Sequence, residues 1–138
     1  MRVWLLDTGP LVAYLDPREQ DHARVAATLE GFTGQLIATS AVIAESMYFL
    51  ASVRRGPTFL AKFVADTGLQ VADFSGADDL ADAARRMEKY ADLPMDYADA
   101  TLVLLAERLG VFDVLTLDRR GFTVYRSAQG KRFTLVLQ

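Results

Sequence analysis

The chain has 138 residues, of which 51% are hydrophobic, and this suits one compact domain with a sizeable core. Its 15 Lys and Arg against 18 Asp and Glu give a formal net charge of −3, which excludes a nucleic-acid binder that works by overall positive charge. Any contact with nucleic acid must come from a local basic patch or from bound cations. The absence of cysteine excludes disulfides, thiolate zinc sites and cysteine nucleophiles.

Short apolar runs alternate with helical patterns in the first half of the chain. We predict strands over Val3–Leu6 and Leu36–Thr39, the first of which ends at Asp7. We predict helices over Thr8–Leu15, His22–Leu29, Ala41–Val53 and Phe59–Ala65, with caps at Asp21 and Ser40 and a break at Gly56-Pro57.

The second half continues the alternation. We predict strands over Leu69–Phe74, Val111–Leu117 and Phe133–Leu137, the last at an edge, and helices over Asp78–Tyr90 and Pro94–Leu109. Strands separated by helices predict an α/β fold for residues 1–138, with a central, mostly parallel sheet of about five strands and helices on both faces. Ligands of such sheets bind beyond the carboxyl ends of the strands, where Asp7 and Asp118 are expected.

The N-terminal segment, Met1 to Asp16, lacks the long uncharged core and cleavage site of a signal peptide. No stretch of the sequence reaches the ~18 consecutive apolar residues of a membrane span. We therefore expect a soluble, cytoplasmic protein without a membrane segment.

Glu45 is the most informative acid. Its helical neighbours are Ala41, Val42, Tyr48 and Phe49, so it interrupts an apolar stripe. A carboxylate among apolar side chains is costly unless it is paired or binds a metal. The alternative to a metal site is a buried ion pair, for example with Arg2 or Arg54.

Asp96 and Asp99 lie three residues apart and share one face of a helix. Both fall near the start of that helix, where the helix dipole favours anions. The apolar neighbours of Asp99, such as Leu102 and Val103, indicate a role beyond this, whereas Asp96 could serve the dipole alone. Asp7 could equally be a helix cap, and Asp118 could be an ordinary turn acid.

The combination of acids predicts a cation site. Two carboxylates ~5 Å apart repel by roughly 3 kcal/mol at an effective dielectric near 20, so several converging acids need protons or cations. Oxygen ligands suit Mg²⁺ or Mn²⁺. Such ions can activate water for attack on a phosphodiester and leave a 5′ phosphate. Arg119 and Arg120 could contact the RNA backbone, although each could equally be a solvated surface residue.

Four short motifs occur in a fixed order along the chain. They are Leu5-Leu6-Asp7-Thr8, Val42-Ile43-Ala44-Glu45, Asp96-Tyr97-Ala98-Asp99-Ala100 and the stretch from Leu115 to Phe122 with Asp118 at its centre. With these motifs the chain resembles the PIN-domain family, and within it the VapC-type toxins of bacterial toxin–antitoxin pairs.

The resemblance implies a three-layer α/β/α fold and a Mg²⁺- or Mn²⁺-dependent endoribonuclease. It implies that Asp7, Glu45 and Asp99 bind metal, that Asp118 matches a more variable fourth position, and that Asp96 is an additional acid. It also implies a supporting role for Thr8, a homodimer, and a small DNA-binding antitoxin as partner. The chain departs from the pattern at Gly121, where related sequences often carry another acid.

Two other functions compete with this hypothesis. The first is a phosphatase or phosphotransferase with Asp7 as the nucleophile, but such enzymes place a second Asp two residues later, where this chain has Gly9. The second is a non-catalytic module that binds protein or RNA and keeps its acids for helix capping. The apolar neighbours of Glu45 and Asp99 speak against that module.

Overall fold

A five-stranded parallel sheet forms the centre of the protein. The structure, a computed structural model, describes residues 1–137. The strand order is β3-β2-β1-β4-β5, and every neighbouring pair is parallel. The predicted parallel sheet with an edge strand at the end of the chain is confirmed. The strands are β1 Val3–Leu6, β2 Gln35–Thr39, β3 Gln70–Ala72, β4 Asp113–Leu115 and β5 Thr134–Leu135.

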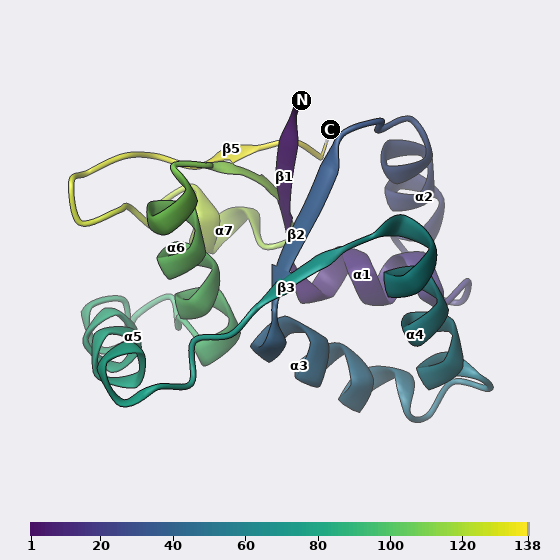
Figure 1. Cartoon of the computed structure of the whole chain (residues 1–138), viewed down its shortest axis with the longest axis horizontal. Helices are drawn as coiled ribbons and strands as arrows, with labels where there is room; N and C mark the ends of the chain where they lie inside the picture. Colours follow the sequence, from purple (N-terminus) through teal and green to yellow (C-terminus); the bar gives the residue numbers. More distant parts are fainter. Residues whose placement is uncertain (138) are drawn as a thin grey trace.

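Helices cover both sides of the sheet, as Figure 1 shows, with α5, α6 and α7 on one side and α1, α2 and α4 on the other. This is the three-layer α/β/α arrangement that the sequence predicts. Within the described residues, no helix has the length and apolar composition that crossing a bilayer requires. The helices are α1 Thr8–Leu15, α2 His22–Glu30, α3 Ser40–Leu50, α4 Gly56–Thr67, α5 Ala77–Lys89, α6 Tyr97–Leu109 and α7 Arg119–Phe122.

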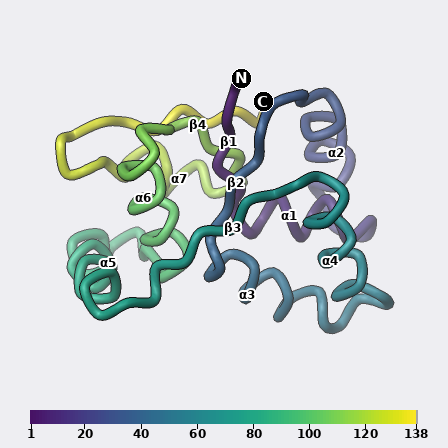
Figure 2. The backbone as a smooth tube through the Cα atoms, viewed as in Figure 1, coloured from purple at the N-terminus to yellow at the C-terminus, as the bar shows by residue number. Residues whose placement is uncertain are grey.

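The core lies around β1 and α6. β1 has neighbours on both edges and buries Trp4, Leu5 and Leu6, which explains its uninterrupted apolar run. The backbone tube in Figure 2 shows β1 and β4 beside each other. Their register pairs Leu6 with Leu115, so the residues that follow these two strands emerge together at one edge of the sheet.

Helix α6 is buried on all its faces from Ala98 to Ala106. It is fixed to β2 by a 2.8 Å hydrogen bond between the hydroxyls of Thr39 and Thr101. A helix so enclosed can hold a polar side chain in its first turn only where a partner or a pocket meets it.

The α3 boundaries differ from the prediction. Thr39, not Ser40, is the cap, because its side-chain oxygen accepts from the Val42 amide at 3.2 Å. The helix ends at Leu50 rather than Val53. A tight turn follows, in which Arg55 has a φ of 60° and a Cβ at Gly56 would lie 2.2 Å from the Leu50 carbonyl oxygen.

Gly56-Pro57 begins α4 rather than breaking a helix, and Pro57 lies in the first turn, where its missing N–H costs nothing. Asp21 occupies the cap position of α2 as predicted, but its side chain makes no capping hydrogen bond. α6 begins at Tyr97 instead of Pro94, and the four-residue helix α7 was not predicted. The three later strands are shorter than predicted because pairing with their neighbours stops after two or three residues.

Candidate active site

Asp7 lies at the carboxyl end of β1, where two sets of hydrogen bonds fix it. Its Oδ1 accepts from the Thr8 amide at 2.8 Å, and its Oδ2 accepts from the Thr116 hydroxyl at 2.7 Å. The side chain is therefore both the cap of α1 and a buried anchor at the sheet edge. The capping role that the sequence offered for Asp7 is therefore present in the structure.

Thr116 joins the ends of β1 and β4. Its hydroxyl donates to Asp7 and accepts from the Asp118 amide at 2.9 Å. Asp118 in turn caps α7, because its Oδ1 accepts from the Gly121 amide at 2.9 Å. Thr116 was not predicted from the sequence, although its position at a strand end, two residues before Asp118, is a signal that could have identified it.

Asp96 and Asp99 form a reciprocal capping box at the start of α6. The Asp99 amide donates to Asp96 Oδ1 at 2.8 Å, and the Asp96 amide donates to Asp99 Oδ2 at 3.1 Å. This box, rather than Pro94, starts the helix. Asp96 is exposed, whereas Asp99 is buried, so the two acids differ in environment as the sequence predicted.

Glu45 is half-buried on α3 and lines the same site. The sequence-based argument that it interrupts an apolar stripe was wrong in part. Its neighbours Tyr48 and Phe49 are 77% and 50% exposed, so Glu45 does not interrupt a fully buried stripe. The alternative ion pair is also absent: within residues 1–137, none of the ion pairs includes Glu45. Glu45 instead contributes to the wall of a pocket.

One pocket of about 570 Å³ collects all five predicted acids at the carboxyl ends of β1 and β4. Thr8 and Phe49 line it as well, together with Glu19, which was not singled out from the sequence. Arg119 and Arg120 are exposed on α7, next to Asp118, and do not line the pocket. The lining residues are Asp7, Thr8, Gly9, Val12, Ala13, Glu19, Glu45, Phe49, Pro94, Asp96, Asp99, Leu117 and Asp118.

The electrostatics of the pocket show uncompensated negative charge. Burial, and then the charges of Asp96 and Glu45, raise the pKa of Asp7 to about 6 despite its hydrogen bonds. Burial, followed by the charges of Asp7 and Asp96, raises the pKa of Asp99 to about 8. Burial and then the Asp99 charge also raise the pKa of Tyr125, so its hydroxyl stays protonated and can donate.

The donor set fits a hard divalent cation. Every polar side chain named at the pocket presents oxygen, and the buried Thr8 hydroxyl has no hydrogen-bond partner within the described residues. In the part of the chain that the structure describes, no three His, Asp or Glu side chains are yet arranged to hold one ion. The oxygen donors are of the kind that Mg²⁺ or Mn²⁺ prefers.

Comparisons with known proteins assign the family. The PIN domain profile matches residues 4–127. Ribonuclease VapC26 of Mycobacterium tuberculosis is 36% identical over 134 residues, which cover 96% of this chain and 98% of the relative.

Two solved structures share the fold at low sequence identity. VapC20 of Mycobacterium tuberculosis, described as a toxin that cleaves the sarcin-ricin loop, has a TM-score of 0.71 at 16% identity and covers 81% of this chain and 86% of its own. FitAcB from Neisseria gonorrhoeae has a TM-score of 0.55 at 20% identity. The match covers 83% of this chain and 86% of the FitAcB chain. The chain belongs to the PIN-domain family.

Proposed function

We propose that this protein is a metal-dependent endoribonuclease that hydrolyses RNA phosphodiester bonds, and that it is the toxin of a type II toxin–antitoxin pair. The observation that carries the proposal is the pocket in which Asp7, Glu45, Asp96, Asp99 and Asp118 meet without an arginine or lysine ion pair within residues 1–137. The 36% identity to a ribonuclease over nearly the whole chain supports the same activity.

Asp7, Glu45 and Asp99 would hold Mg²⁺ or Mn²⁺, with Asp118 and Asp96 beside them. When bound, the ion would activate water and offset charge on the phosphate. The protein contributes position: Thr116 and the Thr8 amide fix Asp7, and the capping box fixes Asp99. Each oxygen of Asp7 accepts one hydrogen bond, and each keeps a second lone pair that could face an ion.

The RNA would lie across the mouth of the pocket. Arg119 and Arg120 are exposed on α7, beside Asp118, where they can contact phosphates on one side of the cleavage point. A small DNA-binding antitoxin and a second copy of the chain are the proposed protein partners. Tyr48 and Phe49, exposed on α3 beside Glu45, offer such partners an apolar surface. An RNA substrate would make the cytoplasm the place of action.

A cleavage assay with one matched control tests the activity. The purified chain, free of antitoxin, is incubated with total RNA and with Mg²⁺, Mn²⁺ or EDTA, and the cut ends are sequenced and tested for a 5′ phosphate. Asp99→Asn is compared with Asp113→Asn, the same change at the amino end of β4, whereas the pocket lies beyond its carboxyl end. We expect cleavage only with metal, lost in the Asp99 variant and kept in the Asp113 variant. Cleavage that continues in EDTA, or equal activity in both variants, would overturn the proposal.

A further inference from the structure

Tyr125 is a fully buried tyrosine that contacts Asp99 but does not itself line the pocket. Its hydroxyl lies 3.4 Å from Asp99 Oδ2, which is long for a hydroxyl–carboxylate hydrogen bond. Within the described residues, Asp99 is the only acceptor for that hydroxyl. A buried phenol with a single partner is costly to move, because any other position would leave its O–H unsatisfied.

Gly121 leaves the space that the hydroxyl occupies. A Cβ at this position would lie 2.7 Å from Tyr125 Oη and 2.4 Å from Asp118 Oδ2. A side chain at position 121 would therefore require both the Tyr125 hydroxyl and the Asp118 carboxylate to move. Gly121, the position at which the chain departs from the family pattern, thus leaves room for the Tyr125 hydroxyl.

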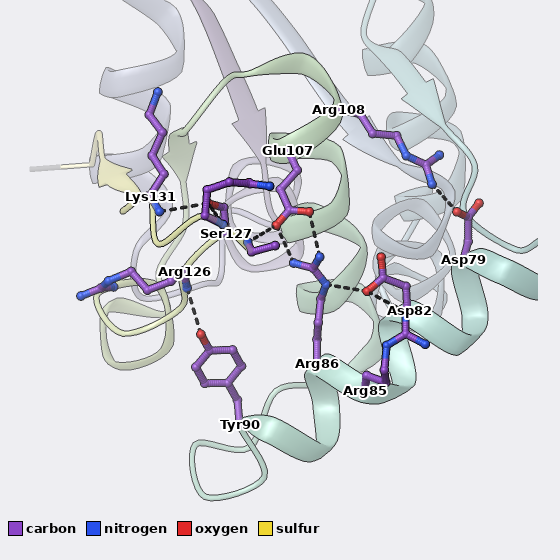
Figure 3. Close-up of polar contacts among 12 residues, drawn as sticks. Asp79, Asp82, Arg85, Arg86, Tyr90, Glu107, Arg108, Arg126, Ser127 and Lys131 are labelled. Atoms are coloured by element: carbon purple, nitrogen blue, oxygen red, sulfur yellow. Dashed lines mark hydrogen bonds and ion pairs between the residues drawn. The ribbon is translucent and has the colours of Figure 1, made fainter.

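Two neighbouring rings fix the direction of the phenol. Tyr90 packs edge-on at 5.1 Å, and Phe122 does so at the same distance. Tyr90 is itself tied to the loop that carries Tyr125, because its hydroxyl accepts from the Arg126 amide at 3.1 Å, as Figure 3 shows. The Tyr125 ring therefore has little freedom to turn its hydroxyl away from Asp99.

The two oxygens of Asp99 differ in their surroundings. Oδ2 accepts from the Asp96 amide and from Tyr125, whereas Oδ1 accepts no hydrogen bond within residues 1–137. A carboxylate held through one oxygen keeps the other available for a ligand. The hydrogen bonds to Oδ2 thus set the orientation in which Oδ1 is offered.

We propose that Tyr125 is a positioning residue, which donates to Asp99 Oδ2 and holds the carboxylate in the orientation that binds the cation, and that Gly121 is required to admit it. This inference rests on the proposed function, because it concerns the same cation. Groups that hold a metal ligand in place typically contribute about 10- to 100-fold to metal affinity.

The test compares Tyr125→Phe with Tyr90→Phe. Both changes remove one hydroxyl from the same pair of packed rings, but only the first removes a contact with Asp99. Mn²⁺ binding to the full chain is measured by calorimetry, and thermal unfolding checks the fold. We expect the Tyr125 variant to bind Mn²⁺ about 10-fold more weakly and the Tyr90 variant to resemble the wild type.

The KM values in the cleavage assay give a second readout. The KM for Mn²⁺ should rise in Tyr125→Phe, while the KM for RNA stays unchanged. Wild-type affinity for Mn²⁺ in a folded Tyr125→Phe would overturn the positioning role and leave the ribonuclease proposal intact. A wild-type protein that binds no Mn²⁺ would overturn both.

Discussion

Two groups of acids in this protein have opposite surroundings. Between α5 and α6, Arg86 bonds both oxygens of Glu107 at 2.8 Å and Asp82 at 3.0 Å, as Figure 3 shows. Asp79 pairs with Arg108 in the same region. Six acids line the pocket beyond β1 and β4, and none of the ion pairs within residues 1–137 includes them.

The two groups differ in how their negative charge is compensated. The α5–α6 acids are compensated by arginine, and the Ala128 amide also donates to Glu107 at 2.6 Å, so this network fixes the C-terminal loop to α6. Burial, and then the charges of neighbouring acids, raise the pKa values of Asp7 and Asp99 in the pocket. Such a site costs stability, and we infer that it is kept for a cation that the chain itself does not provide.

The largest expected effect is on cleavage. Glu45→Gln removes one charge but keeps the shape, so we expect activity to fall by about 100- to 1,000-fold, since metal ions supply several kcal/mol of transition-state stabilisation. Stability without metal should not fall, because the Glu45 charge opposes the Asp7 charge. Cleavage rates and urea unfolding curves check both statements. Retained cleavage would exclude Glu45 from the site.

The second largest expected effect is on stability, and it concerns the acids between α5 and α6. Arg86→Met would leave Glu107 and Asp82 without their shared partner, and we expect a loss of about 2 kcal/mol in the free energy of unfolding. Arg85→Met, which removes only an exposed pair with Asp82 at 3.6 Å, is the control and should cost less than about 1 kcal/mol. Mn²⁺ affinity should be unchanged in both. A weaker Mn²⁺ affinity in Arg86→Met would mean that the two regions are coupled.

The third effect is a pH dependence that only the uncompensated acids produce. Their folded-state pKa values, about 6 for Asp7 and about 8 for Asp99, lie above the ordinary value of 3.8. As the pH rises above about 4, the unfolded chain therefore loses these protons first, and the free energy of unfolding falls until about pH 8. The stability that comes from keeping these two carboxyl groups protonated is therefore fully present below pH 3.8.

Urea unfolding in EDTA between pH 4 and 8 measures this slope. Asp99→Asn should flatten it, and Asp113→Asn should not. Added Mn²⁺ should stabilise the protein most at the alkaline end, where the carboxylates are ionised. A stability that rises over this range would contradict the proposed charge repulsion.

The smallest effect separates the two roles of Asp96. Asparagine caps a helix as well as aspartate does, so Asp96→Asn should change stability by less than about 0.5 kcal/mol, whereas Asp96→Ala should cost about 1 kcal/mol. Because Asp96 is exposed and its Oδ1 is bound to the Asp99 amide, we expect Asp96→Asn to lower cleavage by no more than about 10-fold. A loss as large as that of Glu45→Gln would make Asp96 a principal ligand.

Local signals were enough to predict the frame of the site. The bounds of β1 and α1 are as predicted, because an uninterrupted apolar run and the Asp7-Thr8-Gly9-Pro10 sequence determine them within a few residues. The strand–helix alternation predicted the parallel sheet, and that topology in turn predicted that Asp7 and Asp118 would lie at one edge. The metal-binding roles of the five acids remain predictions.

Other features depended on residues that are distant in the chain. The end of α3 at Leu50 follows from the tight turn at Gly56, which helical periodicity alone does not indicate. The environment of Glu45 was predicted from its neighbours on α3, but Tyr48 and Phe49 face outward because no other element covers them. Propensity and spacing describe one element at a time, so they cannot show which face is covered.

By itself, the sequence determined the succession of the main strands and helices along the chain, because this depends on local periodicity. It also determined the parallel sheet, and with it which carboxylates could lie at the sheet edge, because parallel strands are joined by connections of one hand. Only the tertiary structure decided that Thr116 would join two strand ends, that arginines would compensate the acids of α5 and α6 but not those of the pocket, and that Tyr125 would reach Asp99. Such contacts depend on side-chain directions in a packed interior, where distances of a few ångströms separate a partner from a bystander.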